Sequence, residues 1–112
     1  MKLCLFFTSD LMFSSRVKPL AHEKEFEIRF PAATSTEFSD QPELVIFDLE
    51  FVPPGDLGAI LENLRAAATD IPRTIAYAPH VKEKLLENAR GLGVDEVWTR
   101  GQFNRNFGSL FD

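Results

Sequence analysis

The residue with the clearest chemical potential is Asp48, which ends the apolar run Leu44–Phe47. A carboxylate there must emerge at the edge of the fold or find a partner, because burying it alone costs several kcal/mol. An ion pair with Arg100 is one prediction for Asp48, and a direct functional role is the other. If the pair forms, replacing Asp48 by alanine leaves Arg100 uncompensated and lowers stability. Other residues that end or closely follow such runs are Thr8, Ser9, Asp10, Glu50, Tyr77, Ala78 and His80.

Five segments of strand length must position these side chains. Three are continuous apolar runs, which are typical of parallel strands covered on both faces. Segment Phe26–Phe30 alternates polar and apolar residues, which predicts a half-exposed edge strand ended by Pro31. The remaining segment, Glu96–Thr99, is shorter and more alternating. The three continuous runs are Leu3–Phe7, Leu44–Phe47 and Thr74–Tyr77.

Helical patterns separate the later strands. Asp56 is the expected N-cap of one helix, preceded by a Pro-Pro-Gly approach that is not helical. A further helix is expected to start near Val81 and to end before Gly93, which takes a left-handed conformation. The apolar faces comprise Leu57, Ile60, Leu61 and Leu64 in the former and Leu85, Ala89 and Leu92 in the latter.

The first helix is expected to begin at a cap formed by Ser9 or Asp10. Pro19 lies inside its pattern. Because proline removes a backbone donor and crowds the carbonyl of Ser15, we expect a kink or an early end. The residues expected to face the sheet are Leu11, Val17, Leu20 and Ala21.

The chain ends in an aromatic segment. Phe103, Phe107 and Phe111 are four residues apart, which predicts a short final helix with one aromatic stripe. Trp98 precedes them on an edge strand. Two interpretations stay open: the rings close the core of a small domain, or together with Trp98 they form an exposed patch that meets a partner.

The alternation of strands and helices predicts an α/β fold. We expect one doubly wound domain over residues 1–112, with a five-stranded parallel sheet in the order 2-1-3-4-5. Its second and fifth helices are shortened. Segment 32–43 is too polar and too short for more than one turn, around Thr36–Ser39, and the final helix is limited to the short aromatic tail. Ligands of such sheets bind at the carboxyl ends of the strands, so the polar residues named above line the expected crevice.

Composition excludes several classes of protein. The chain has 112 residues, with 12 Lys or Arg against 17 Asp or Glu and a formal charge of -5, which disfavours nucleic-acid and anionic-membrane surfaces. A single cysteine, Cys4, excludes an internal disulfide and a cysteine metal cluster. No run approaches the roughly 20 apolar residues of a membrane span, and the apolar start is too short for a secretory signal, so a cytoplasmic location is expected. Glycine-rich phosphate loops are absent, and no cofactor is expected.

Three segments resemble the receiver domains of response regulators. Residues 42–50 are similar to the third receiver strand, which ends in the aspartate that accepts phosphate, and residues 52–57 are similar to the loop that follows it. Residues 91–97 are similar to the passage into the last strand. Asp10–Val17 and Ala78–Val81 also resemble a small group of stand-alone receiver-like proteins of unassigned function. The resemblance implies a flavodoxin-like fold with Asp48 at the phosphoacceptor position.

The departures from receivers concern the chemistry. Receivers carry an acidic pair after the first strand that holds a divalent metal, and at that place stand Phe7 and Thr8. Mg²⁺ needs hard oxygen ligands to neutralise the charges of phosphoryl transfer. The receiver hydroxyl after strand four falls at Tyr77 or Ala78, and the lysine after strand five falls at Arg100.

We therefore predict a degenerate, stand-alone pseudo-receiver. It is a protein-interaction module that works without phosphorylation, is not an enzyme, and holds no metal. The resemblance implies that its partner, or a second copy, binds through the fourth helix, fifth strand and fifth helix. Two alternatives stay open. The first is a single-domain regulator phosphorylated on Asp48, with an atypical metal site using Asp10 and Glu50. The second is a ligand-binding or enzymatic flavodoxin-like domain with a pocket at Thr8, Asp48, Tyr77 and His80.

Overall fold

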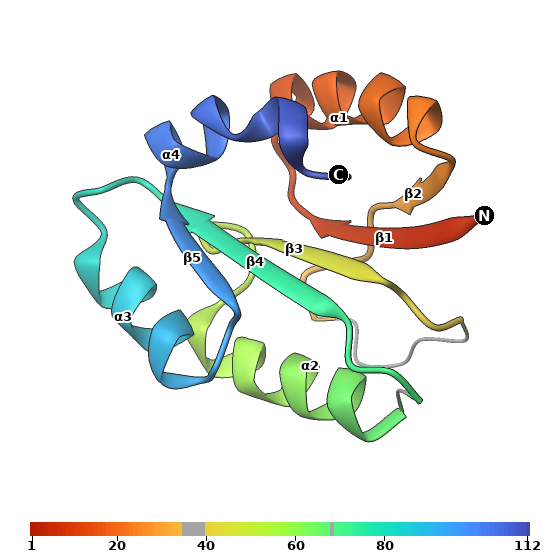
Figure 1. Cartoon of the computed structure of the whole chain (residues 1–112). Helices are drawn as coiled ribbons and strands as arrows, with labels where there is room; N and C mark the ends of the chain where they lie inside the picture. Colours follow the sequence, from red (N-terminus) through yellow and green to blue (C-terminus); the bar gives the residue numbers. More distant parts are fainter. Residues whose placement is uncertain (35–39, 68) are drawn as a thin grey trace.

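The computed structural model describes residues 1–34, 40–67 and 69–112. It contains a five-stranded parallel sheet in the order β2-β1-β3-β4-β5 (Figure 1). The predicted α/β class and strand order are confirmed. The strands are β1 (Lys2–Phe7), β2 (Phe26–Arg29), β3 (Leu44–Asp48), β4 (Arg73–Ala78) and β5 (Glu96–Thr99).

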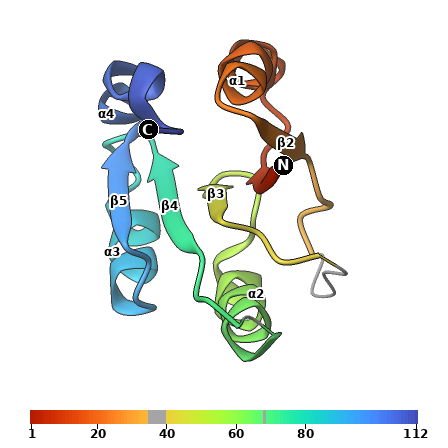
Figure 2. The ribbon, with the colours of Figure 1, turned by 45° about the vertical axis from the view of Figure 1, so that its right-hand side comes forward.

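Helices cover both faces of the sheet. Figures 1 and 2 show the first and last helices above the sheet and the helices between them in sequence below it. The helices are α1 (Leu11–Glu23), α2 (Pro54–Ala67), α3 (Glu83–Gly91) and α4 (Arg100–Arg105), followed by the 3₁₀ turn η1 (Phe107–Ser109). Among the described residues, no helix is long and apolar enough to span a membrane.

The two layers have different cores. The α2–α3 side is mainly aliphatic, and includes Leu61, Val45 and Leu86. The α1–α4 side is aromatic, and includes Phe6, Phe13 and five further aromatic side chains with little exposure. These are Phe26, Tyr77, Phe103, Phe107 and Phe111. The sheet therefore buries both faces, as the continuous apolar runs predict.

The predicted starts of two helices were wrong, by three residues for α2 and by two for α3. α2 begins at Pro54, because proline at the first helical position needs no backbone donor. Asp56 consequently lies in the first turn and is not the cap. α3 begins at Glu83, so Val81 lies in the preceding loop, 71% exposed. Gly93 has φ +85°, which confirms its left-handed conformation.

α1 differs from the prediction at two residues. Asp10 is its cap, but Leu11 is 80% exposed and does not face the sheet. The helix also continues through Pro19 to Glu23, so the expected early end was wrong. Pro19 lies on the exposed side, and the buried faces of Val17 and Ala21 hold this part of the helix on the sheet despite the lost hydrogen bond.

The face of β2 that points away from α1 is polar, so no helix is needed to bury it. Glu27 and Arg29 alternate with inward-facing residues and are exposed, as the half-exposed edge strand predicts. Arg29 donates to Glu27 (2.5 Å) and to Asp40 (2.8 Å). A polar face needs no apolar helix on it, and none lies between β2 and β3 in the described part of that connection. The turn expected at 36–39 lies outside the described residues.

Candidate functional site

A polar row crosses the sheet at the carboxyl ends of three strands. Asp48 pairs in register with Tyr77, and Phe47 pairs with Phe7, so Thr8 lies opposite Asp48. Because side chains alternate along each strand, Thr8, Asp48 and Tyr77 all face the α1–α4 layer. Ala78 packs on the other face, in the α2–α3 core. Only Tyr77 of the two predicted alternatives therefore shares the face of Asp48.

Both carboxylate oxygens of Asp48 have partners. Thr8 Oγ1 donates to Oδ2 at 2.8 Å, and the backbone N–H of Glu50 donates to Oδ1 at 3.0 Å. Asp48 is 5% exposed, and Thr8 is 8% exposed. Hydrogen bonds to a carboxylate offset part of the cost of its burial. Asp48 is thus held as a buried acceptor at the end of β3.

Thr8 links Asp48 to the start of α1. Its Oγ1 accepts from the backbone N–H of Asp10 at 3.0 Å. The Oδ1 atom of Asp10 then accepts from the N–H groups of Met12 (2.9 Å) and Phe13 (3.1 Å), which caps the helix. A continuous chain of hydrogen bonds therefore runs from the β3 end to the first turn of α1.

Arg100 extends this series of hydrogen bonds, and its position corrects the predicted ion pair with Asp48. Its Nη2 donates to Oδ2 of Asp10, so the cation pairs with Asp10 and not with Asp48. The guanidinium lies 4.6 Å from the centroid of the Phe13 ring. The bond to Arg100 lowers the pKa of Asp10, and the same bond raises the pKa of Arg100. The side chain that caps α1 is the nearer acceptor for the first residue of α4.

Tyr77 is fully buried next to the Asp48 site. Its ring stacks on Phe103 at 4.0 Å and 10°, and meets Phe13 edge-on at 5.7 Å. Its hydroxyl has no hydrogen-bond partner within the described residues. Burial, and then the nearby negative charge of Asp48, raise the pKa of Tyr77. The end of β4 next to Asp48 is therefore filled by a large ring that belongs to the core.

The acids needed for a metal site do not assemble here. Phe7 faces the α2–α3 layer and stacks on Phe47 at 5.1 Å. Glu50 is exposed, and Asp10 is bonded to Arg100. The described residues contain no group of three metal-binding side chains. Ser9 and His80 are also exposed, so the predicted crevice residues are split between a buried row and its rim.

The aromatic tail forms core. Phe103, Phe107 and Phe111 are 0%, 3% and 8% exposed, so they cannot form the exposed patch considered for them. Trp98 is half-buried and lies 6.2 Å from Phe103, between ring centroids. The stripe is buried because α4 and η1 pack against the aromatic side chains on this face of the sheet. The alternative in which the rings close the core describes the structure.

Sequence reasoning missed Phe13, which packs on Tyr77 of the polar row. Phe13 is 3% exposed and contacts Tyr77, Phe103 and Arg100. Its signal was present in the sequence. Phe13, Val17 and Ala21 are four residues apart, and they form the buried face of α1.

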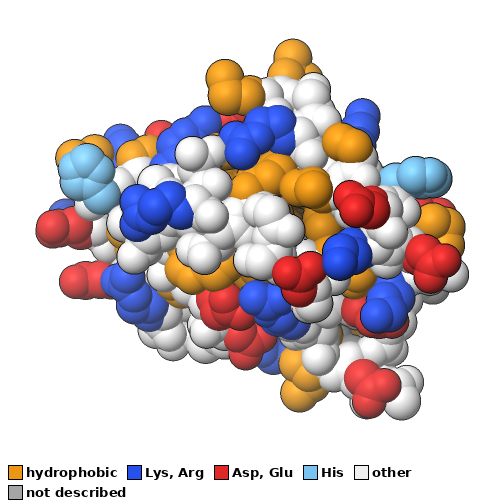
Figure 3. All heavy atoms as spheres, turned by 45° about the horizontal axis from the view of Figure 1, so that its top comes forward, with side chains coloured by type: hydrophobic (Ala, Val, Ile, Leu, Met, Phe, Trp, Pro, Cys, Tyr) orange, Lys and Arg blue, Asp and Glu red, His pale blue; other side chains and the backbone are white. Residues whose placement is uncertain are grey.

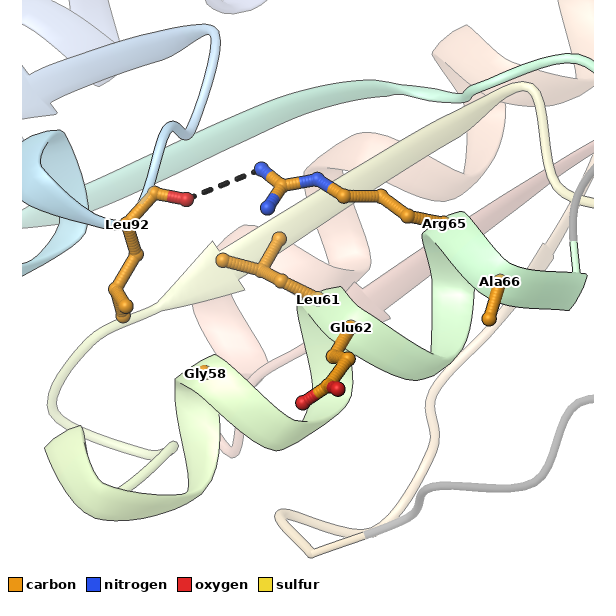
Figure 4. A pocket seen from close by; sticks show the side chains of 6 residues that line it. All are labelled: Gly58, Leu61, Glu62, Arg65, Ala66 and Leu92. Atoms are coloured by element: carbon orange, nitrogen blue, oxygen red, sulfur yellow. Dashed lines mark hydrogen bonds between the residues drawn. The ribbon is translucent and has the colours of Figure 1, made fainter.

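A separate pocket lies between α2 and α3, on the opposite layer from Asp48. Figure 4 shows Arg65 reaching from α2 towards the end of α3, where Nη2 donates to the carbonyls of Leu92 (3.1 Å) and Gly93 (3.0 Å). These carbonyls follow the last turn of α3, where a cation is favourable. Arg65 therefore joins the two helices. The residues lining the pocket are Gly58, Leu61, Glu62, Arg65, Ala66 and Leu92.

Comparisons with known proteins identify the fold. No protein-family model matches the chain, and no curated protein matches its sequence. The structure is similar to a CheY-like protein, tadZ, from Pseudomonas aeruginosa PAO1, with a TM-score of 0.70 and 13% identity over 98% of this chain and 99% of that one. It is also similar to the receiver domain of a sensor histidine kinase from the same organism, determined with magnesium in its active-site cleft (TM-score 0.66, 12% identity, 98% and 97% covered).

A third similar structure is a response regulator from Burkholderia pseudomallei with a phosphorylated aspartic acid and a calcium ion. Its TM-score is 0.72 at 10% identity, over 100% of this chain and 67% of that one. The chain therefore has the CheY-like, flavodoxin-like fold of response-regulator receiver domains. This confirms the resemblance at the level of the fold.

Proposed function

We propose that this chain is a receiver-like signalling module that binds protein partners without accepting a phosphoryl group on Asp48. The observation that carries the proposal is the state of that carboxylate. Asp48 is 5% exposed, and Thr8 and the Glu50 N–H occupy its two oxygens. The module is not an enzyme and acts in the cytoplasm.

The charge balance of the site supports this proposal. Phosphoryl transfer to a carboxylate brings several negative oxygens together, and a divalent cation normally offsets them. Phe7 faces the opposite layer, and Thr8 offers a hydroxyl where an acid would be needed. The positive charge of Arg100 is already paired with Asp10. A phosphoryl group at Asp48 would meet little compensating charge.

The hydrogen bonds also give Asp48 a structural task. The chain from Arg100 through Asp10 and Thr8 to Asp48 connects α4, α1 and the loop after β3. By accepting these hydrogen bonds, Asp48 keeps α4, α1 and the loop after β3 in one fixed arrangement around the crevice. No observation favours the phosphorylated alternative with Asp10 and Glu50, or an enzymatic flavodoxin-like domain.

Two measurements on the full chain test the proposal. In ¹H–¹⁵N NMR spectra, adding Mg²⁺ and beryllofluoride should leave the amides of Thr8, Glu50 and Tyr77 unchanged. Incubation with acetyl phosphate should add no mass. An authentic receiver treated in parallel serves as the positive control. A single phosphoryl adduct that disappears in Asp48→Asn would overturn the proposal.

A further inference from the structure

The outer surface of α1 and α4 carries exposed apolar side chains beside two arginines, of which Arg100 is paired with Asp10 and Arg16 forms no salt bridge within the described residues. We call this surface the α1–α4 patch, defined by Leu11, Met12, Arg16, Arg100 and Asn104. We propose that the α1–α4 patch binds an acidic protein segment that also carries apolar side chains. This inference rests on the proposed protein-binding role and identifies the surface and the chemistry of the partner.

The apolar part of the α1–α4 patch lies in the first turn of α1. Leu11 is 80% exposed and Met12 is 67% exposed. Met12 and Arg16 are four residues apart, so they lie on one face of the helix. Figure 3 shows this side of the molecule, with apolar side chains in its middle and both basic and acidic side chains around them. Exposed apolar groups with a polar rim are typical of protein-binding surfaces.

Arg16 is held in place before any partner arrives. Its Nη1 donates to Oδ1 of Asn104 at 2.7 Å, and its guanidinium lies 4.3 Å from the Phe107 centroid. No carboxylate of the described residues forms a salt bridge with it. The remaining N–H donors of the fixed guanidinium can bind a partner carboxylate, with little further loss of side-chain entropy.

The charge of this layer is opposite to that of the chain. Residues 9–24 and 99–112 carry five Lys or Arg and three Asp or Glu, whereas the whole chain carries 12 and 17. Two of those three acids are already paired, Asp10 with Arg100 and Asp112 with Lys24. An approaching acidic segment is therefore attracted to this layer and repelled by the rest of the molecule.

This charge distribution selects the occupant. A nucleic acid has negative charge along its whole length and would meet the acidic remainder of the chain. A short protein segment with carboxylates beside leucine-like side chains satisfies Arg16 and covers Leu11 and Met12 at once. The predicted surface differs from the one around Trp98 and the aromatic tail, whose rings are buried.

The test uses a synthetic peptide of about 14 residues, or four helical turns, with Glu and Leu at helical spacing. Titrated into the ¹⁵N-labelled full chain, it should shift the amides of Met12, Arg16 and Asn104. Arg16→Glu should weaken its affinity by about tenfold or more, because attraction becomes repulsion. The matched control is Arg90→Glu on the exposed side of α3, which should leave the affinity unchanged.

A second variant tests the apolar part. Leu11→Ser combined with Met12→Ser changes exposed side chains only and should also weaken binding. Equal affinity for a peptide of the same composition in scrambled order, or shifts confined to α2 and α3, would overturn the proposal. So would concentration-dependent self-association lost in Arg16→Glu, because the occupant would then be a second copy. These outcomes are independent of the beryllofluoride experiment, so failure of either proposal is recognised separately.

Discussion

At the scale of single residues, the site depends on a hydroxyl with two tasks. Thr8 donates to Asp48 and accepts from the Asp10 N–H, so one atom satisfies a buried and a part-buried polar group. Thr8→Val keeps the shape and removes both bonds. We expect the free energy of unfolding to fall by about 1–3 kcal/mol, because buried groups lose their partners. Urea denaturation measures this, with the exposed Ser9→Ala as control. A loss no larger than that of the control would contradict the role given to Thr8.

Asp10 makes the stability of the fold depend on pH. Its bond to Arg100 lowers its pKa in the folded state below the value of the unfolded chain. The resulting stabilisation is therefore complete above the unfolded pKa of about 3.9 and is lost as the pH falls through the lower folded value. The stability difference between wild type and Asp10→Asn should be largest near neutral pH and shrink below about pH 4. Urea denaturation across this range measures it, with Glu87→Gln on α3 as control. A pH-independent difference would contradict the pairing.

Placing an acid beside Asp48 should change both stability and metal response. In Thr8→Asp, a second carboxylate lies opposite Asp48, and like charges this close raise one pKa and destabilise the fold at neutral pH. We expect a lower melting temperature than wild type, and millimolar Mg²⁺ should recover part of the loss. Wild type should show no such response. Thr8→Asn, which adds no charge, is the matched control and should not respond either.

At the scale of elements, the end of α3 combines a left-handed glycine with two hydrogen bonds from Arg65. Gly93 has φ +85°, and a Cβ there would lie 3.2 Å from Nη2 of Arg65. Gly93→Ala should cost about 1–2 kcal/mol through backbone strain, with disturbance of the Arg65 bonds in addition. The control is Gly91→Ala, where nothing lies within 4 Å of the new Cβ and stability should be unchanged or higher. Thermal unfolding compares the two, and equal effects would contradict the strain.

The elements also show what the sequence can predict. The strands and their order follow from continuous apolar runs and the α/β alternation, and their bounds agree within about one residue. Helix starts were harder, because Pro54 fits the first helical position and competes with Asp56 as the start signal. Gly93 was predictable, since few other residues adopt its conformation.

The location of the candidate site could be predicted from the sequence, but the hydrogen-bond partners of its residues could not. The position of Asp48 follows from the end of its strand, and parallel topology brings Thr8, Tyr77 and Arg100 to the same edge. Thr8 lies opposite Asp48 because of the register between β1 and β3, which cannot be read from the sequence alone. Arg100 had two acids within reach, and the cap of α1 placed Asp10 nearer to it.

At the scale of the whole molecule, the α1–α4 layer joins the sheet through an aromatic cluster. Phe103 is 0% exposed, and its ring contacts Phe6, Phe13, Tyr77, Trp98 and Phe107 at centroid distances of 4.0–6.2 Å. If these rings are core, losing one weakens the whole fold. If they were a partner surface, the isolated chain would tolerate the loss.

Phe103→Ala should therefore lower the free energy of unfolding by about 3–5 kcal/mol, the usual cost of removing a buried ring. The milder Phe103→Leu leaves a smaller cavity and should cost less, which keeps the measurement possible if alanine unfolds the chain. The matched control is Met12→Ala, because Met12 is 67% exposed in the same layer and should change stability little. Urea unfolding followed by fluorescence of Trp98, the chain's one tryptophan, reports on the same cluster. Unchanged stability in Phe103→Leu would show that the last helix is not part of the core, and the α1–α4 layer would then have to be held by α1 alone.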